Sequence, residues 1–501
     1  IIEYRYQVTV WNLTYWHSWR FQESVPVLHS RFTLSSPAEL DVDYRTYGLD
    51  VEPQVIDAPT GFNSTYKWEV RNVEPLKSEI GMPSLNEVTK RLALAPIGVK
   101  TWDDVSKWYH QLVRPRMQAN NKIRDIVAEL TEDADSDYEK LRNIYTWVRD
   151  QVRYIAVEIG IGGYQPHYVK KVFSNQYGDC KDMVTLLCSM GEEAGIDMYQ
   201  TLISSQPNGI PDTTLPSQFQ FNHVIAYAPE VGENGIWMDP TEKGTEFGEL
   251  PWYDQGMPVL MVGEDGEGQF LTTPKVSVQE NKVTIDWRVD LDESGAASVH
   301  GTKKLWGSPA SELREDLFGA TRTSREKWLE RQVASLCSGA DLDSFRITGL
   351  DPIQNPLQLE YFFNTKTFAV PRSERMVFRP GSIASFDYPD LFRSARREYP
   401  IRFQFGMLRD VNIVMNLPDS WNPETPSYHD SVASEFGKAS WEWETAGTQF
   451  HTHARYLMND EEIPPAKYDA FREFLDQVRY HDLQEVLLRK EERPVADAQP
   501  N

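Results

Sequence analysis

The order of hydrophobic and polar positions divides the chain into three regions, of which the first is typical of β structure. Every second residue from Tyr4 to Val10 is hydrophobic, and this spacing of two predicts a strand with one buried face. Prolines interrupt the rest of the region at turn-like intervals. We therefore expect a β-sandwich-like N-terminal domain over residues 1–97.

After residue 100 the spacing changes to that of helices. The run from Thr101 to Asp104 has a capping sequence, and hydrophobic residues then recur three and four positions apart up to Leu112. Ser136 begins a second helix of the same kind. Helical and strand patterns mix between about 154 and 262, so we expect an α+β core over residues 98–265.

The third region returns to strand patterns. Gly263 to Gly268 is rich in glycine and acidic residues, which is typical of a linker. A helical insertion is predicted from Ser308 to Cys337 and a helix over residues 465–490. Alternating strand patterns occupy residues 281–303, 357–370 and 447–457. We expect residues 266–501 to form a C-terminal β-sandwich-like domain with a terminal helix, and the whole chain to be a multidomain α+β protein.

One segment of the core has the features of a reactive cysteine. Gly178 ends an irregular stretch, and hydrophobic residues then recur at helical spacing from Met183 to Ala194. Cys180 falls in the first turn of that predicted helix. Free backbone N–H groups and the positive end of a helix stabilise a thiolate. Cys180 is therefore a candidate nucleophile.

A candidate base and its partner follow on two strand-like segments. His223 lies in an alternating run and shares a face with Phe221 and Ile225, so its side chain is expected to point toward packed structure. Asp239 comes directly after a short strand pattern and before a proline. A carboxylate at a strand end can orient an imidazole, so the order along the chain is Cys, His, Asp.

Composition and charge narrow the class of protein. The 501 residues are 40% hydrophobic and 25% charged, as in folded proteins of several domains. Acidic residues outnumber basic residues 75 to 51, and the net charge of −24 repels phosphate backbones. We expect no nucleic-acid partner, although solubility alone also explains the charge. No hydrophobic run approaches the ~18 residues of a membrane span.

The cysteines and histidines indicate no disulfide framework and no metal. Cys180 and Cys188 lie on one predicted helix, roughly 12 Å apart along its axis, which is too far for a bridge. We interpret Cys188 and Cys337 as small hydrophobic residues in helices. His451 and His453 share one face of a predicted strand but lack an evident third ligand. We expect no metal and no cofactor.

The segment from Tyr154 to Asp239 resembles the transglutaminase-like core of the papain-like thiol-enzyme superfamily. The resemblance rests on GDCKD at 178–182, NHV at 222–224 and WMDP at 237–240, together with IGIGGYQP at 159–166. The run TWDDVSKWY from Thr101 resembles the junction between such a core and a preceding β domain. In bacterial proteins, such cores are commonly flanked by an N-terminal β domain of unknown function and a C-terminal β domain.

The resemblance implies a role for each member of the constellation. Cys180 would be the nucleophile, His223 the base and acid, and Asp239 the residue that orients His223. The implied reaction is acyl transfer through a thioester. The oxyanion would be held by the backbone N–H of Cys180 and by one side-chain donor, for which we select Gln176.

The same resemblance bears on the substrate and on location. Trp237 is expected to pack beside the triad, and Tyr164 and Gln165 are expected to line the substrate cleft. The substrate would be a peptide or protein amide, and the protein would be exported to the periplasm or cell surface of a bacterium. The first residue is Ile rather than Met, so we expect the native start to be missing.

The favoured function is that of a thiol hydrolase that cleaves amide or peptide bonds. Two alternatives stay open. The first is a protein-glutamine transamidase, in which an amine outcompetes water at the thioester. The second is a non-catalytic scaffold whose flanking β domains bind a polymer or a partner. The sequence does not indicate the oligomeric state.

Overall fold

The computed structural model describes residues 2–9, 18–37, 42–56, 64–95, 98–156, 160–381, 392, 394–460 and 462–491. Two compact units make up the chain. Unit 1 comprises Ile1–Glu242 and Phe247–Lys275, and unit 2 comprises Lys243–Glu246 and Val276–Asn501. The sequence features placed on Val10 and Ile159 lie outside the described residues.

Unit 1 begins with two small antiparallel sheets that share one hydrophobic core. The first sheet has the order β2-β5-β4 (Val27–Ser36, Ser64–Val73, Gln54–Ile56), and the second has the order β1-β6-β3 (Trp19–Arg20, Arg91–Leu94, Tyr44–Tyr47). Phe21, Trp68 and Leu92 are fully buried between them. The short helix α1 (Leu85–Val88) lies between β5 and β6 in the chain. This arrangement is the sandwich-like domain that the sequence predicts.

The strand predicted from Tyr4 is wrong for the residues that the structure describes. Residues 2–9 carry no strand, and the side chains of Tyr4, Tyr6 and Val8 are exposed. Alternation produces a stable strand only when a neighbouring strand supplies hydrogen bonds and a surface to bury one face.

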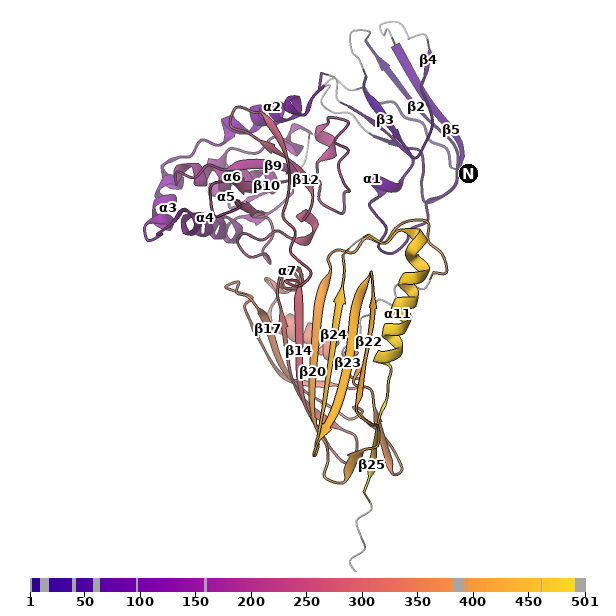
Figure 1. Ribbon diagram of the computed structural model, residues 1–501. Coiled ribbons are helices and arrows are strands. Elements are labelled where there is room, and N and C mark those ends of the chain that lie inside the picture. Colours follow the sequence, from indigo (N-terminus) through magenta and orange to yellow (C-terminus); the bar gives the residue numbers. More distant parts are fainter. Residues whose placement is uncertain are drawn as a thin grey trace, which may run out of the picture. The chain divides into compact units, whose positions relative to one another are not determined.

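The rest of unit 1 is an α+β core around one antiparallel sheet (Figure 1). The sheet has the order β11-β10-β9-β12-β13 (Ile236–Met238, His223–Ala228, Tyr199–Ile203, Pro258–Val262, Gly268–Thr272). A two-stranded parallel pair, β7 with β8 (Arg153–Tyr154, Tyr177–Gly178), leads into the central helix. The helices are α2 (Trp102–Val113), α3 (Asn121–Thr131), α4 (Asp137–Gln151), α5 (Val169–Asn175) and α6 (Cys180–Glu193), with 3-10 turns η1 to η4 (Arg114–Arg116, Gly160–Gly163, Gln218–Gln220, Trp252–Asp254).

The two faces of this sheet are covered differently. Leu202, Val224 and Ala226 belong to the large cluster that includes the buried side of α6. Ile225 and Trp237 belong to a smaller cluster on the other face, closed by residues from the loop around η4. Helix α6 is buried from Cys180 to Gly191, including the polar residues Lys181, Asp182, Thr185 and Ser189.

The segment Gly263–Gly268, predicted as a linker, is instead the turn of a hairpin. Val262 pairs with Gly268, and strands β12 and β13 run antiparallel on either side. The Gly263 N–H donates to the Glu267 carbonyl at 2.8 Å. Gly266 has a φ of +80°, which glycine adopts without strain. The glycines serve this tight turn, and the sheet of the core continues to Thr272.

Unit 2 is built on an eight-stranded sheet with the order β16-β17-β15-β14-β20-β24-β23-β22. All neighbouring pairs are antiparallel except β14 with β20, which is parallel. The strands are Asp341–Thr348, Leu357–Thr365, Ala297–Leu305, Lys282–Leu291, Met407–Asn416, Gln449–Met458, Gly437–Ala446 and Tyr428–Ser434, in the same order. A four-stranded sheet, β18-β19-β25-β21 (Val370–Arg372, Arg375–Phe378, Val486–Lys490, Trp421–Pro423), shares its core.

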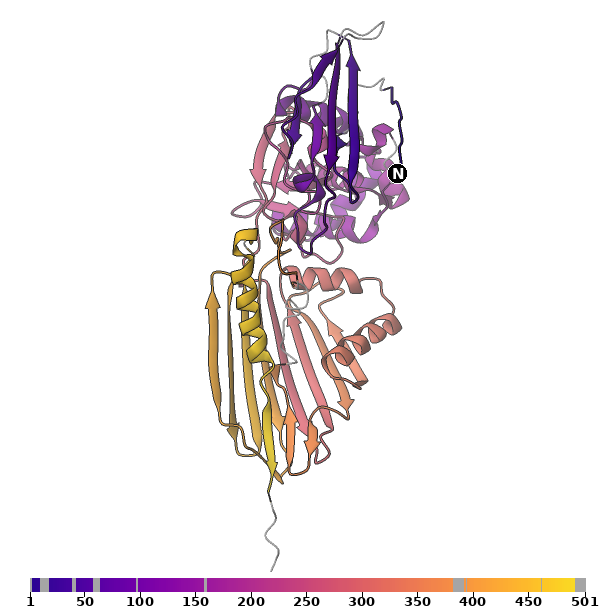
Figure 2. The same ribbon diagram turned by 90° about the vertical axis from the view of Figure 1, so that its right-hand side faces the viewer.

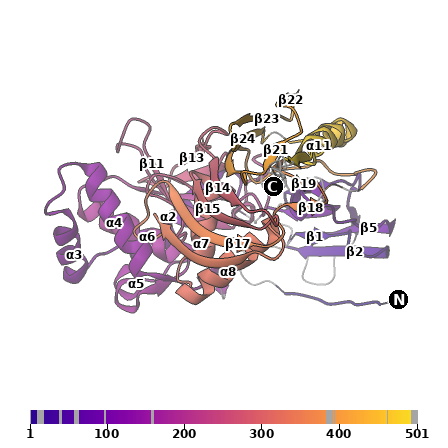
Figure 3. The same ribbon diagram turned by 90° about the horizontal axis from the view of Figure 1, so that it is seen from below.

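Helices complete unit 2. Helix α11 (Tyr468–Asp482) runs along the sheet beside β22 (Figures 1 and 2) and buries Phe471 and Phe474 in the shared core. The predicted insertion is two helices, α7 (Ser308–Leu317) and α8 (Arg322–Leu336), both labelled in Figure 3, and α8 packs against β16. Gly319, with a φ of +69°, separates them. The terminal helix that the sequence predicts is therefore present, but it ends at Asp482, and Val486–Lys490 form strand β25 instead of its last turns. The predicted insertion is divided.

Candidate active site

Cys180 is the first residue of the buried helix α6. Asp179 caps the helix: its Oδ1 accepts a hydrogen bond from the Asp182 N–H at 3.2 Å, and the Asp182 carboxylate accepts from the Asp179 N–H at 3.4 Å. This reciprocal pair is a capping box, which fixes the start of a helix. The Cys180 side chain is buried, with 7% of its surface exposed.

Polar residues inside α6 all have partners, which allows the helix to be buried. Lys181 forms an ion pair with Asp179. Thr185 donates to the Lys181 carbonyl at 2.5 Å, and Ser189 donates to the Met117 carbonyl at 2.7 Å. A buried polar group costs stability only when it lacks a partner. The helix can therefore hold Cys180 in the interior without exposing polar atoms.

Gly178 allows the chain to approach the start of α6. A Cβ atom at this position would lie 2.5 Å from the Cβ of Asp182. Asp182 also accepts hydrogen bonds from the N–H of His167 at 2.7 Å and from its Nδ1 at 3.0 Å. The cap of α6 therefore also fixes the segment that carries Tyr164 and Gln165.

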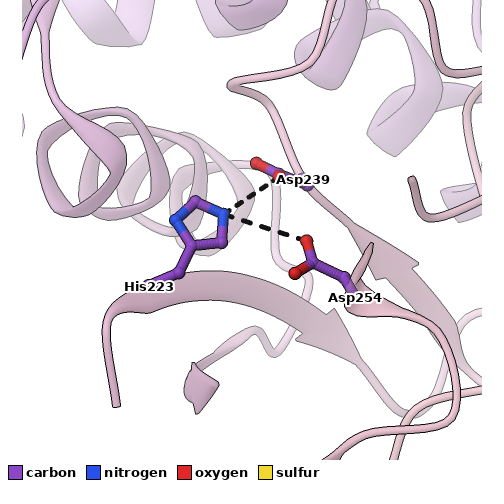
Figure 4. A group of neighbouring side chains, drawn as sticks. All are labelled: His223, Asp239 and Asp254. Atoms are coloured by element: carbon purple, nitrogen blue, oxygen red, sulfur yellow. Dashed lines mark hydrogen bonds and ion pairs between the residues drawn. The ribbon is translucent and has the colours of Figure 1, made fainter. Parts of the chain in front are cut away.

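The structure brings Cys180, His223 and Asp239 together. His223 begins β10, pairs with Ile203 of β9, and is mostly buried. Its Nε2 lies 3.0 Å from Oδ2 of Asp239, which follows β11 directly (Figure 4). The Cys180 thiol lies near enough to the imidazole of His223 to raise its pKa. Since Nε2 faces Asp239, Nδ1 is the nitrogen left for Cys180.

Asp239 is held rigidly and without contact to solvent. Its side chain is 0% exposed, and its Oδ1 accepts hydrogen bonds from the N–H and the hydroxyl of Thr241 at 2.9 and 2.7 Å. The Tyr145 hydroxyl donates to the Asp239 carbonyl at 3.1 Å. A carboxylate with this many donors stays ionised and oriented.

The pKa values of the pair are shifted in opposite directions. Burial lowers the pKa of His223, but the charge of Asp239 and the hydrogen bonds to Asp239 and Cys180 outweigh it, so the pKa rises well above its usual value. Burial raises the pKa of Asp239, but His223 and the Thr241 donors outweigh it, so this pKa falls. The geometry therefore favours an imidazolium next to a carboxylate.

A second carboxyl group, Asp254, lies in the site although no sequence pattern predicts it. It ends η4 and is 0% exposed, and its Oδ2 lies 3.9 Å from Nε2 of His223 (Figure 4). His223, Asp239 and Asp254 each present one potential ligand atom within 4.8 Å of the others, so these three side chains could hold a metal ion. The only signal in the sequence is one acidic residue in the aromatic run Pro251–Asp254.

The remaining predicted site residues make contacts of their own. Tyr164 is half-buried between the rings of Trp108 and Phe219, at centroid distances of 5.3 and 6.3 Å. Trp237 stacks on Tyr227 at 4.1 Å. Gln165 is half-buried and follows η2.

Gln176, the proposed oxyanion donor, ends α5. Its φ of +53° is left-handed, and its N–H donates to the Val172 carbonyl at 2.9 Å. Its side chain is exposed. The other two cysteines of the chain are buried, and burial raises the pKa of both Cys188 and Cys337.

Family models match three parts of the chain. Residues 124–199 match the transglutaminase-like superfamily, a segment that contains Cys180. Residues 1–77 match a domain of unknown function, DUF3857, and residues 374–488 match another, DUF3858.

The chain carries a transglutaminase-like core. The two flanking domains are those named DUF3857 on its N-terminal side and DUF3858 on its C-terminal side. The predicted resemblance to a transglutaminase-like core between two flanking domains is therefore confirmed, including the order of the three parts. The core match ends at residue 199 and does not include His223 or Asp239.

One solved structure agrees with this fold. A "putative protease" from Parabacteroides distasonis ATCC 8503 is similar at 14% identity with a TM-score of 0.62, over 94% of this chain and 74% of that chain. A "putative cysteine protease" from Cytophaga hutchinsonii matches at 13% identity with a TM-score of 0.22, over 45% of this chain and 74% of that one. No curated protein matches the chain. Among the helices that the structure describes, none is long and apolar enough to cross a membrane.

Proposed function

We propose that the protein is a thiol hydrolase that cleaves amide or peptide bonds through a thioester on Cys180. One observation carries the proposal: Cys180, at the first position of a capped and buried helix, lies next to His223, and one ring nitrogen of His223 contacts the buried carboxylate of Asp239 at 3.0 Å. A nucleophile, a base and a group that orients the base in this order make up a catalytic triad.

The acylation step uses each member of the triad. The thiolate of Cys180 attacks the carbonyl carbon, and a C–S bond forms as the electron pair moves onto the carbonyl oxygen. The imidazolium of His223 then gives its proton to the leaving nitrogen as the C–N bond breaks. An amine or ammonia departs, and the acyl group remains as a thioester. Asp239 keeps Nδ1 of His223 directed at the reaction.

Hydrolysis of the thioester returns the enzyme. His223 takes a proton from water, the hydroxyl oxygen bonds to the acyl carbon, and the C–S bond breaks. In both steps the negative oxygen needs donors. The backbone N–H of Cys180 is at the first turn of α6, where such groups lack intrahelical acceptors, and we assign the second donor to Gln176.

We assign the substrate to peptides or protein amides. Tyr164, Gln165 and Trp237 are the residues that we expect to line the cleft, and substitution of each should raise KM more than it lowers kcat. Export to the periplasm or cell surface completes the proposal, and cell fractionation tests it.

The first test is competitive alkylation by limiting iodoacetamide at neutral pH, mapped by mass spectrometry. Cys188 and Cys337 are internal controls, since both thiols are buried and have raised pKa values. We expect Cys180 to react fastest and His223→Ala to slow it. A Cys180 that reacts no faster than the controls, and is indifferent to His223, would point to the scaffold alternative. Ammonia release compared with amine incorporation then separates hydrolysis from transamidation.

A further inference from the structure

Asp254 is a buried carboxyl group directed at the His223–Asp239 pair without a donor of its own. Both of its oxygens are buried, and no hydrogen-bond donor among the described residues reaches either one. Oδ2 lies 3.9 Å from Nε2 of His223, which is too long for a hydrogen bond. The oxygen atoms of Asp254 and Asp239 lie within 4.8 Å of each other. A buried ionised carboxylate without donors is costly, so this group needs an explanation.

The backbone holds Asp254 in this place. Its N–H donates to the Pro251 carbonyl at 3.0 Å, and its carbonyl accepts from the Thr273 hydroxyl at 2.5 Å. The next residue, Gln255, is anchored through its side-chain amide to the Leu250 carbonyl at 2.7 Å. These bonds prevent the loop from turning the carboxyl group toward water.

The charges around Asp254 do not favour its ionised form, which would be a second carboxylate beside Asp239. Asp254 faces His223 at the start of β10, and it faces Asp239 and Glu242 in the segment that follows β11. Within its own turn, Tyr253 is hydrogen-bonded to Glu242. On α4, the Tyr145 hydroxyl donates to the Asp239 carbonyl, and the Cys180 thiol also acts on the pKa of His223. One imidazolium thus faces several acidic groups, and close carboxylates share protons in such a setting.

We propose that Asp254 is a positioning residue: a neutral carboxylic acid that donates a hydrogen bond to the Asp239 carboxylate. This inference rests on the proposed function, because it assigns a role in that same triad. The protonated form supplies the donor that explains why a buried carboxyl lies beside another carboxyl. It leaves a single negative charge, on Asp239, to face His223.

Two observations agree with this assignment. Burial raises the pKa of Asp254 well above its usual value; His223 opposes the rise, while the charge and hydrogen bond of Asp239 add to it. The pKa of Asp239 moves in the opposite direction. The pKa values of two interacting carboxyl groups move apart in this way when one group holds the proton that the pair shares. A hydrogen bond donated by Asp254 to the Asp239 carboxylate also makes Asp239 a weaker acceptor for the imidazole proton.

The direct test is infrared difference spectroscopy of the full chain at neutral pH, comparing wild type with Asp254→Asn. We expect the wild type to show the C=O band of a protonated carboxyl group that the variant lacks. In Asp239→Asn, burial still raises the pKa of Asp254, so the band should remain, shifted because its carboxylate acceptor is gone. A wild-type spectrum with only carboxylate bands at this site would overturn the inference. This readout does not depend on catalysis.

The second test follows the His223 ring protons by NMR and the alkylation rate of Cys180, both across pH. Asparagine keeps a donor, so Asp254→Asn should leave the His223 titration in place and the alkylation rate within about threefold. Asp254→Leu removes the donor and should move the His223 titration to higher pH. A structural role alone would lower stability in the Leu variant without displacing either pH profile, and that result would count against the proposal.

Three other outcomes are informative. If His223 titrates at a lower pH in Asp254→Asn than in the wild type, the substitution has removed a negative charge, and the inference is overturned. Stoichiometric zinc in the purified wild type that Asp254→Asn lacks also overturns it, because Asp254 is then an ionised metal ligand. Slow alkylation of Cys180 that ignores His223→Ala refutes the proposed function, and the infrared band still decides the state of Asp254.

Discussion

Lys181 and Asp179, the two neighbours of Cys180 in the chain, form an ion pair with each other. Both are buried, with 4% and 2% of their surfaces exposed. Asp179 is also the cap of α6. A capping carboxylate next to a nucleophilic sulfur would oppose the thiolate, because like charges repel. The ammonium of Lys181 offsets that charge, so the cap can fix the helix without suppressing the reactive form of the cysteine.

Lys181→Met should therefore destabilise unit 1 by about 3–5 kcal/mol, because it leaves a buried carboxylate without its partner. The measurement is the free energy of unfolding from urea titration. The double variant with Asp179→Asn should recover most of the loss, since it removes the stranded charge. The matched control is Lys140→Met, which breaks the partly exposed pair with Asp137 and should cost about 0–1 kcal/mol. Equal losses in the two lysine variants would contradict the prediction.

Asp239→Asn should change how Cys180 reactivity depends on pH. Burial lowers the pKa of His223, and Asp239 more than offsets it, so removal of the charge should leave the imidazole neutral at pH 7. We expect Cys180 alkylation between about pH 6 and 7 to slow by about tenfold or more, and to recover at higher pH as the thiol ionises unaided. A variant with the wild-type profile would show that Asp239 does not tune His223.

The same shift predicts a pH dependence of stability. A raised pKa in the folded state means that protonated His223 stabilises the fold fully below its unfolded pKa of ~6.5, and that this contribution is lost as the pH rises through the shifted value. In Asp239→Asn that contribution disappears. Thermal unfolding of both proteins across pH provides the measurement, with His29→Asn, an exposed histidine, as the control.

Asp482 in unit 2 should make stability fall between about pH 4 and pH 6. Burial raises its pKa to about 6, against the hydrogen bonds from Tyr456 and Trp441. The folded state therefore favours the neutral acid, and a shift of about two units corresponds to roughly 3 kcal/mol lost as the pH rises through this window. Asp482→Asn keeps the acceptor and should be flat across the window. A wild-type curve that matches the variant would refute the shift.

Arg314 should be essential for the stability of unit 2. It is 0% exposed, and its guanidinium donates to the carbonyls of Gly349 and Gln354 at 3.0 and 2.8 Å and to the Asn355 side chain at 2.8 Å. Arg314→Met would leave these buried acceptors unpaired, at a cost of about 3–5 kcal/mol. Arg331→Met, at an exposed position of α8, should change the free energy of unfolding by about 0.5 kcal/mol or less.

Local patterns in the sequence predict much of the candidate site. Helix α6 begins where the spacing of hydrophobic residues and Gly178 place it, and the strands that carry His223 and precede Asp239 follow from alternation and a proline. The division of the helical insertion is also encoded locally: Gly319 and the capping Thr321 indicate an end and a start that the overall helical spacing obscures.

Long-range packing determines what the sequence does not predict. Asp254 reaches His223 only because the loop around η4 folds back over the sheet and is fixed by Thr273, and no periodicity marks such a contact. The alternation at Tyr4 predicts a strand equally well whether or not a partner strand exists. The hairpin at Gly263 looks like a linker because both need glycine, and only the pairing of Val262 with Gly268 distinguishes them.

The parallel pair β14–β20 has a consequence for how unit 2 forms. Asp286 and Asn412 are direct partners in this pair although they are 126 residues apart in the chain. Such distant contacts are slow to form, because the entropy of loop closure is lost before the contact returns any energy. During synthesis the middle of the eight-stranded sheet cannot form until β20 has been synthesised. Until then, β14 and β15 form a hairpin with an open hydrophobic edge. Aggregation during expression should therefore be most severe in truncations that end between residues 305 and 407, which contain β14 and β15 but lack β20.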